Sequence, residues 1–330
     1  MLDVYTLFLF YGKELLLMII RLGGDNRYST AITISNAIYK KSNTVILVTA
    51  QDYYDALIVV PLARAYNAPV LLVTENSSND YTLTETQLKH LKAKRIIVVN
   101  TNNVISNVTK VSLKALKINT TYIESGNCFE TAVKVANALK SVTSKNPDTL
   151  FFVTDSSFAD ALSISSVAAI MKSPVLYLNN IGNMNPAINK YLNSVKGKIK
   201  NAYIIGGTAV ISNAMMNSVA TALSLTVNST VIRVSGSNRY ETCVAVNNKF
   251  SSILSSNNIC VATGLDFPDA ITGGVYAAKT KQAILLADGN KLQSYQSTYL
   301  KSKKPSNITV FGDTGAVPTS LVNLIQQASK

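Results

Sequence analysis

Short apolar runs and longer apolar stretches alternate along the 330-residue chain. The short runs are rich in β-branched residues and are apolar throughout, which is typical of strands that are buried on both faces. Most of the longer stretches begin near Asn, Asp, Ser or Thr, the residues that cap helix N-termini. Strands that alternate with helices of about 10 to 15 residues predict an α/β fold with parallel sheets covered on both faces.

One nine-residue pattern occurs three times, and each copy follows a short apolar run. The pattern starts with Thr, has Asp at its seventh position and continues with Ala and then Leu or Ile. Its seventh-position aspartates, Asp55, Asp160 and Asp269, are 105 and then 109 residues apart. This separation predicts three copies of a domain-sized unit rather than a short solenoid repeat. The copies cover residues 49–57, 154–162 and 263–271.

Three tandem units agree with the chain length, because a single core stops growing at roughly 250 to 300 residues. No long linker separates the units, so we expect them to touch. Each is expected to open with a strand, at 15–22, 121–124 and 231–234. The expected divisions are an atypical apolar N-terminal stretch at 1–18 and three repeats at 19–120, 121–229 and 230–330.

The N-terminal stretch is apolar but does not resemble a targeting segment. Asp3 precedes any basic residue, and Lys13 and Glu14 interrupt the apolar run. The stretch therefore has neither the 18 uncharged residues of a membrane span nor the basic start of a signal peptide. We interpret it as neither, and we expect no membrane insertion.

The chain carries a net charge of +13, although only 15% of its residues are charged. Each of the three repeats is basic, so the excess is spread over the whole body. Such a charge favours an anionic partner, which is a nucleic acid, an anionic lipid or an acidic polymer. No basic helix with interleaved aromatic residues is present, so nucleic-acid binding would depend on charge alone and is not expected.

Enzymatic and metal chemistry have little support. The single histidine, His90, has no Cys or His cluster near it, which argues against a zinc site or a Ser/His/Asp triad. Cys243 and Cys260 fall in a predicted helix and strand and are interpreted as small buried residues. The glycine motifs match neither GxGxxG nor a phosphate-binding loop, so no cofactor is predicted.

The repeated aspartates admit two interpretations. One is acid–base work by paired carboxylates, Asp52 with Asp55 and Asp266 with Asp269, but the second repeat has Ser157 in the first of these places. The other places each seventh-position aspartate at a helix N-cap, where its carboxylate accepts a free backbone N–H, or beside an arginine. The second interpretation explains the residues more simply, and no catalytic residue is predicted.

In repeats one and three, a positive charge lies at the start of the first helix. Arg27 and Arg239 directly follow a capping Asn, which places a cation at the positive end of a helix. This position is unfavourable unless an anion lies nearby. The anion is either an aspartate from a strand-end loop or a phosphate or carboxylate of a ligand. The candidate aspartates are Asp52, Asp55, Asp266 and Asp269.

Four recurring motifs, at 22–31, 69–72, 205–212 and 265–271, closely resemble the type 2 cell-wall-binding repeat of clostridial and related Gram-positive surface proteins. The resemblance covers residues 19–330. It implies three Rossmann-like α/β domains with parallel sheets in a pseudo-threefold arrangement. It also implies a protein that is not an enzyme and that anchors non-covalently to the cell wall through an anionic, teichoic-acid-like secondary wall polymer. S-layer proteins or a wall amidase are the implied further partners, and a partner or modifier subunit of an amidase is the alternative function.

The resemblance and the charge pattern together give a predicted polymer site at the strand ends. In it, Asp55 and Asp269 orient the arginines of repeats one and three. The second repeat has Cys128 in the arginine position, so we expect its pocket to contribute least to binding. The predicted polymer-binding residues are Arg27, Tyr28, Asp55, Asp160, Arg239, Tyr240 and Asp269.

Overall fold

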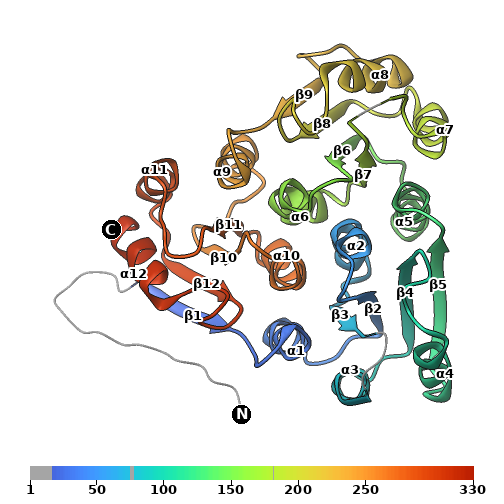
Figure 1. Cartoon of the computed structure of the whole chain (residues 1–330), viewed down its shortest axis with the longest axis vertical. Helices are drawn as coiled ribbons and strands as arrows, with labels where there is room; N and C mark the ends of the chain where they lie inside the picture. Colours follow the sequence, from blue (N-terminus) through green and yellow to red (C-terminus); the bar gives the residue numbers. More distant parts are fainter. Residues whose placement is uncertain (1–16, 75–77, 181) are drawn as a thin grey trace.

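Three α/β units surround a common centre in the computed structural model, which describes residues 17–74, 78–180 and 182–330 (Figure 1). Each unit contains one sheet of four parallel strands with helices on its faces. The predicted fold class, three Rossmann-like units in a pseudo-threefold arrangement, is confirmed. Nearly all of the predicted N-terminal stretch at 1–18 lies outside the described residues.

The first sheet has the strand order β3-β2-β4-β5, and all of its strands are parallel. Its central strand β2 is buried along its whole length, as the uniformly apolar sequence predicts. The elements of this part of the chain are α1 (Arg27–Ile38), β2 (Thr44–Thr49), α2 (Tyr53–Tyr66), β3 (Val70–Val73), α3 (Ser78–His90), β4 (Arg95–Thr101), α4 (Asn107–Ala115) and β5 (Asn119–Ser125).

The second sheet repeats this plan with the order β7-β6-β8-β9. Its first helix, α5, has 16 residues, whereas α1 has 12. The elements are α5 (Cys128–Thr143), β6 (Thr149–Thr154), α6 (Ala159–Met171), β7 (Val175–Leu178), α7 (Pro186–Val195), β8 (Asn201–Ile205), α8 (Asn213–Leu223) and β9 (Val231–Val234).

The third sheet joins the two ends of the described chain, with the order β1-β12-β10-β11. Strand β1 pairs in parallel with β12, from Met18 beside Asn307 to Leu22 beside Phe311. The elements are β1 (Met18–Leu22), α9 (Arg239–Lys249), β10 (Ile259–Thr263), α10 (Pro268–Thr280), β11 (Ala283–Ala287), α11 (Ser294–Lys303), β12 (Asn307–Phe311) and α12 (Thr319–Ala328).

The sheets and the sequence repeats do not contain the same residues. The strand that opens each repeat pairs with the last strand of the preceding repeat, so β5 completes the first sheet and β9 the second. Strand β1 completes the third sheet in the same way, which closes the three units into a ring. The boundaries expected at 120/121 and 229/230 stay predictions about the sequence, because each sheet extends across one.

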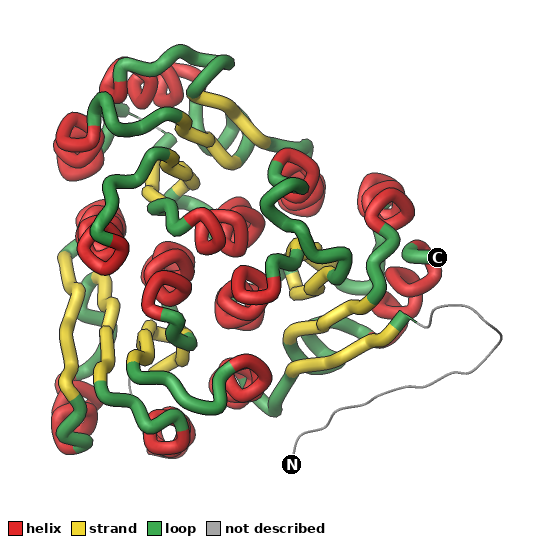
Figure 2. The backbone as a smooth tube through the Cα atoms, turned by 180° about the vertical axis from the view of Figure 1, so that it is seen from behind, coloured by secondary structure: helices red, strands yellow, loops and turns green. Residues whose placement is uncertain are grey.

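Helices α2, α6 and α10 pack against one another at the centre, as Figures 1 and 2 show from opposite sides. In α6 every residue from Ala159 to Ala169 is buried, in keeping with a stretch that is mostly apolar or small on all faces. Small residues allow the close approach. A Cβ placed on Gly274 of α10 would lie 3.0 Å from Ser165 Oγ of α6 and 3.4 Å from Val60 Cγ1 of α2.

A substitution in α10 tests how tightly this helix packs against its own sheet. A Cβ at Gly273 would overlap the ring of Phe311 in β12. We expect Gly273→Ala to lower the free energy of unfolding by about 1–3 kcal/mol through overpacking, in spite of the gain of about 1 kcal/mol in helix propensity. The measurement is urea denaturation followed by circular dichroism. Gly126→Ala is the control, since a Cβ there meets no atom within 4 Å; equal stabilities of the two variants would show that this contact is loose.

Candidate functional site

The N-terminal ends of the central helices meet the entry loops of the neighbouring repeats at three equivalent junctions. Each junction combines the aspartate loop of one repeat with the start of the first helix in the next, around the ring. We name them by the repeats that they join. The 1/2 junction joins residues 52–55 to 125–131, the 2/3 junction joins 157–160 to 235–242, and the 3/1 junction joins 266–269 to 23–30.

An aromatic cluster lies where the three junctions converge. The ring centroids of Tyr53, Phe158 and Phe267, one from each repeat, are 5.9, 6.1 and 6.2 Å apart. These residues are not among the predicted site residues, although each copy of the nine-residue pattern has an aromatic residue at its fifth position. The cluster forms an apolar centre from which the polar groups of the junctions extend outward.

Each arginine at a helix start lies over one of these rings. The guanidinium carbon of Arg27 is 6.0 Å from the ring centroid of Phe267, and that of Arg239 is 5.5 Å from the centroid of Phe158. Each also donates a hydrogen bond to a backbone carbonyl at the second position of the pattern. Arg27 Nη1 is 2.6 Å from the oxygen of Ala50, and Arg239 Nη1 is 2.7 Å from that of Gly264.

The two arginines differ in their acidic neighbours. Arg27 Nη2 is 3.2 Å from Asp266 Oδ2, so one of the expected internal ion pairs is present. Both side chains of this pair are more than a third exposed, and such pairs add little stability. Arg239 makes no salt bridge with any described residue, although its charge acts on the nearby carboxyl of Asp160.

The repeated aspartates are not the N-caps of their helices, so that prediction is wrong. In α2 the capping residue is Asp52, whose carboxylate accepts the N–H of Tyr54 at 3.1 Å. In α6 and α10 the N-cap position holds Phe158 or Phe267, without a side-chain cap. The repeated aspartate lies in the first turn, from which its carboxylate reaches the strand end of the same sheet instead of its own helix terminus.

The carboxylate of Asp55 binds the end of strand β4. It accepts the backbone N–H of Thr101 at 3.0 and 3.1 Å and the Thr101 hydroxyl at 2.5 Å. That hydroxyl lies 2.8 Å from the hydroxyl of Thr131 in the next repeat. Asp55 therefore ties the end of β4 to its own helix and, through Thr101, to the start of α5. The structure does not pair Asp55 with Arg27, or Asp269 with Arg239, as predicted, because the two members of each pair lie at different junctions.

In the other two repeats, the strand end that approaches the repeated aspartate carries a glycine. Gly206 and Gly312 follow β8 and β12 and have φ angles of +115° and +97°, which L residues rarely adopt. A Cβ on either would overlap the carboxylate of Asp160 or Asp269, respectively. These glycines therefore allow the backbone after each strand to approach an aspartate.

Burial raises the pKa of Asp55, Asp160 and Asp269, each to about 6. At Asp160 the charge of Arg239 opposes the shift. At Asp269 the neighbouring carboxylates of Asp266 and Asp313 increase it. Each junction thus contains a carboxyl group that burial favours in its protonated form.

These shifts predict that the fold is more stable in mild acid. Between the usual aspartate pKa of 3.8 and about 6, the folded chain binds more protons than the unfolded chain. The free energy of unfolding should therefore rise as the pH falls from about 7 to about 5. Asp55→Asn mimics the protonated carboxyl and should make this slope shallower in urea titrations. Asp148→Asn, at an exposed position, is the control; identical slopes for both variants would refute the assignment.

The two tyrosines of the predicted polymer site, Tyr28 and Tyr240, are buried or partly buried. Tyr240 is 8% exposed, and burial raises its pKa to about 12. Its ring lies against Gly264, where an added Cβ would be 2.6 Å from Cε1. Tyr28 is partly buried against the core. A polymer-binding role for either tyrosine stays a prediction.

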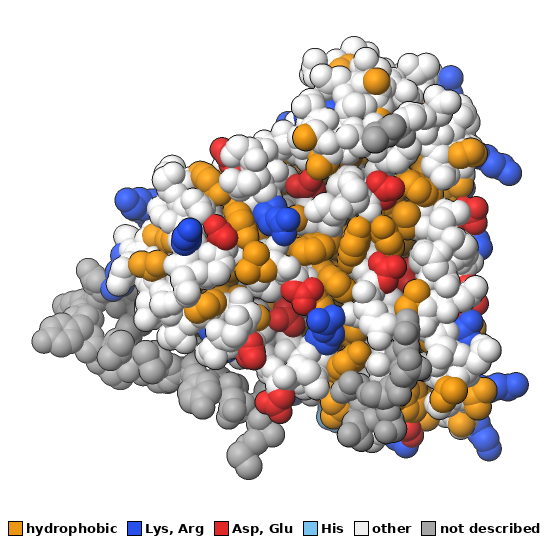
Figure 3. All heavy atoms as spheres, in the orientation of Figure 1, with side chains coloured by type: hydrophobic (Ala, Val, Ile, Leu, Met, Phe, Trp, Pro, Cys, Tyr) orange, Lys and Arg blue, Asp and Glu red, His pale blue; other side chains and the backbone are white. Residues whose placement is uncertain are grey.

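The junctions also differ in open space and in charge. The 2/3 junction contains a cavity of about 350 Å³, whose charged lining residues are Asp160 and Arg239. The 3/1 junction contains one of about 140 Å³, where four carboxylates accompany Arg27. Figure 3 shows acidic and basic side chains close together around an apolar centre on one face of the molecule. The four carboxylates are those of Asp25, Asp266, Asp269 and Asp313.

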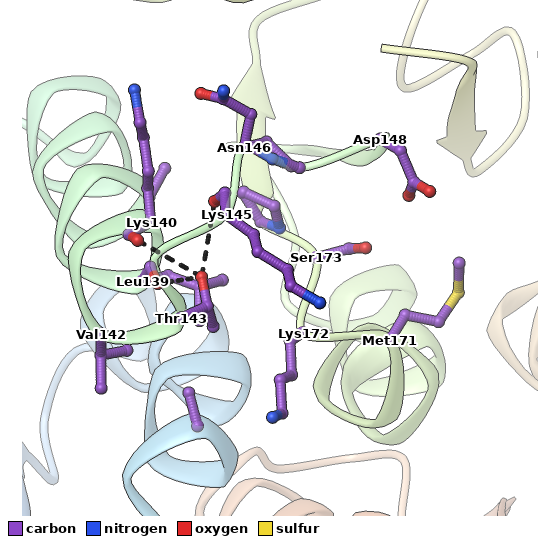
Figure 4. A pocket seen from close by; sticks show the side chains of 14 residues that line it. Leu139, Lys140, Val142, Thr143, Lys145, Asn146, Asp148, Met171, Lys172 and Ser173 are labelled. Atoms are coloured by element: carbon purple, nitrogen blue, oxygen red, sulfur yellow. Dashed lines mark hydrogen bonds between the residues drawn. The ribbon is translucent and has the colours of Figure 1, made fainter. Parts of the chain in front are cut away.

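A further cavity of about 430 Å³ lies at the C-terminal ends of α5 and α6 and includes none of the predicted site residues. Lys145 and Lys172 extend across it, whereas Lys140 points away (Figure 4). Lys140 is in the last turn of α5 and Lys172 is the C-cap of α6. Cations at these places are favoured by the helix dipole, which accounts for Lys140 and Lys172 without a ligand.

Comparison with known proteins identifies the class to which this three-unit ring belongs. A family model described as cell wall binding domain 2 (CWB2) matches residues 21–110, 123–216 and 233–322. The chain belongs to this family, as the sequence motifs predict, and it is a cell-wall-binding, surface-associated chain of Gram-positive type. No helix in the described part of the chain has the length and apolar character needed to cross a membrane.

Two relatives and two solved structures are similar over nearly all of this chain. N-acetylmuramoyl-L-alanine amidase LytC of Bacillus subtilis is 34% identical over 306 residues, 93% of this chain and 58% of the relative. The amidase enhancer of the same organism is 26% identical over 309 residues, with coverages of 92% and 39%. Cwp6 and Cwp8 from Clostridium difficile superpose with TM-scores of 0.84 and 0.81 at 26% and 25% identity. The chain covers 48% of Cwp6 and 51% of Cwp8, and 94% of it is matched in each case.

Proposed function

We propose that this chain anchors non-covalently to the cell wall by binding an anionic secondary wall polymer, chiefly at the 2/3 junction. The observation that carries this proposal is the environment of Arg239. Its guanidinium faces a cavity of about 350 Å³ and has no carboxylate partner within salt-bridge distance among the described residues. An arginine has five N–H donors, and one hydrogen bond, to Gly264, leaves others for a phosphate or carboxylate.

The neighbours of Arg239 support the same proposal. Ser157 stands where the other repeats have Asp52 and Asp266, so the junction has one carboxylate fewer. The remaining carboxyl, Asp160, has a pKa raised to about 6, which reduces its repulsion of an anion in mild acid. The ring of Phe158 lies within cation–π distance of the guanidinium group, 5.5 Å from its central carbon.

The 3/1 junction is a weaker site in this proposal. Arg27, the one cation among the described residues that line this cavity, is already paired with Asp266, and three further carboxylates line the cavity. A polymer anion would meet net negative charge unless it displaced Asp266 or bound with some of these carboxyls protonated. Arg27 is therefore expected to contribute less than Arg239, and the Cys128 position less again.

Retention on purified cell walls tests this order. Arg239→Ala should weaken wall binding by about tenfold or more, as expected for one charge-assisted contact. Arg27→Ala should have a smaller effect, and Cys128→Ala almost none. Co-sedimentation with walls over a range of wall concentrations gives the affinities, and melting temperatures show whether each variant is folded.

Walls stripped of their secondary polymer by acid provide the decisive control. Undiminished binding of the unsubstituted chain to stripped walls would exclude the polymer as the ligand. Excess duplex DNA should not displace the chain from intact walls, since no nucleic-acid role is proposed. Release by Cys128→Ala, with both arginine variants still bound, would contradict the assignment of the junctions.

A second function is suggested by the relatives, one named as an amidase and one as an amidase enhancer. In this alternative the chain is a partner or modifier subunit of a wall amidase and has no hydrolase activity of its own. Association with S-layer proteins is a further proposal from the motif resemblance. Faster release of muropeptides by an added amidase, in the presence of the chain, would favour the amidase role over simple anchoring.

A further inference from the structure

We propose that the 1/2 junction is a permanently closed seam, in which tyrosines replace the missing arginine. The chain would then bind polymer only at the two junctions that involve repeat three. The structural part of this proposal is independent of the ligand, whereas its consequence for binding depends on the function proposed above. Four observations support it.

A tyrosine hydroxyl makes the hydrogen bond that the arginine makes elsewhere. At the other junctions the guanidinium donates to the carbonyl at the second position of the pattern, that of Ala50 or Gly264. The equivalent carbonyl at the 1/2 junction belongs to Asp155, and it accepts the hydroxyl of Tyr53 at 2.8 Å. Repeats two and three have Phe158 and Phe267 in the place of Tyr53, so only this repeat has the hydroxyl.

A second tyrosine lies beside the cysteine that replaces the arginine. Tyr54 stands where the other repeats have Ala159 and Pro268. Burial raises the pKa of Tyr54, and the nearby Cys128 adds to this shift. Its ring centroid is 4.4 Å from that of Tyr53. A bulky side chain is thus present only at the junction where the long arginine side chain is missing.

A third tyrosine fixes Tyr54 from the neighbouring sheet. Tyr177 of β7 is fully buried, and its hydroxyl donates to the backbone carbonyl of Tyr54 at 2.8 Å. Its ring packs edge-on against the Tyr54 ring, with centroids 5.7 Å apart. The other repeats have Leu72 and Leu286 at this position, which offer no such donor. The three tyrosines occur together at the one junction that lacks an arginine.

The charged and titratable groups at this junction do not favour an anion. Asp55 is fully buried, and Thr101 donates to its carboxylate through both the backbone N–H and the hydroxyl. Cys128 is 8% exposed, and burial together with Asp155 raises its pKa to about 12, so the group that replaces the arginine is an uncharged thiol. Without a cation, this junction cannot compensate the charge of a phosphate.

Replacing residues of the 1/2 junction by their counterparts from the 2/3 junction tests whether the tyrosines close the 1/2 junction. The triple variant Tyr53→Phe/Tyr54→Ala/Cys128→Arg gives the 1/2 junction the residues Phe158, Ala159 and Arg239 of the 2/3 junction. We expect Cys128→Arg alone to lower the melting temperature, because the guanidinium and the tyrosines compete for one space and one carbonyl. Tyr53→Phe/Tyr54→Ala should also lower it, by about 2–4 °C or more, through the lost hydrogen bond and the cavity.

The triple variant tests whether the arginine and the tyrosines are structural alternatives at this junction. If arginine and the tyrosines are alternatives, its melting temperature should be clearly higher than the sum of the two separate losses predicts. Additive or larger losses would overturn the proposal, whatever the chain binds. Tyr66→Phe, on the same helix α2 but at its opposite end, is the control for loss of a tyrosine hydroxyl.

Wall binding then tests the functional consequence. The folded triple variant should bind intact walls more tightly than the unsubstituted chain, by at least a fewfold, and the gain should disappear on acid-stripped walls. Positive coupling in stability without a gain in binding would keep the seam but overturn the idea that it closes a polymer site. Failure of the unsubstituted chain itself to bind intact walls would refute the proposed function and leave the stability result unaffected.

Discussion

The close packing of α2, α6 and α10 is the constraint on which the rest of the structure depends. Small residues bring the helices together, and their N-terminal ends consequently converge on the cluster of Tyr53, Phe158 and Phe267. Each aspartate loop is thereby placed against the first helix of the next repeat. The junctions exist because three units share one centre, so a single repeat in isolation would have only half of two junctions and no part of the third.

The junctions combine buried acids with partly exposed arginines, and the balance between them differs around the ring. Desolvation disfavours all three repeated aspartates as anions, yet Asp55 holds the end of β4 in place through Thr101. At the 2/3 junction one arginine faces one carboxyl, whereas at the 3/1 junction it faces four. The overall basic charge of the chain therefore gives little information about these pockets, where local pairs of charges determine what is bound.

Sequence patterns predict the fold well because strand and helix periodicity is a local property. The threefold repeat, the parallel sheets and the contact between units follow from it. The exchange of β1, β5 and β9 between repeats depends on long-range pairing and has no local signal. The N-cap assignment of Asp55 failed for a related reason, since its partner, Thr101, lies 46 residues further along the chain. Comparison of the repeats position by position could have revealed the aromatic cluster and the exchange of arginine for tyrosine.

The pairing of β1 with β12 has a consequence for the order in which the molecule is assembled. Strand β1 is synthesised before the other described elements of the ring, whereas its partner β12 is followed only by α12 among them. Until β12 is available, β1 has no ladder to join, and the ring stays open with an unpaired strand that carries an apolar sequence. The first two sheets can form as their strands appear, whereas the third requires almost the entire chain. Folding of the last unit should therefore be the slow step, and the period before closure the one in which contact with another copy of the chain is most damaging.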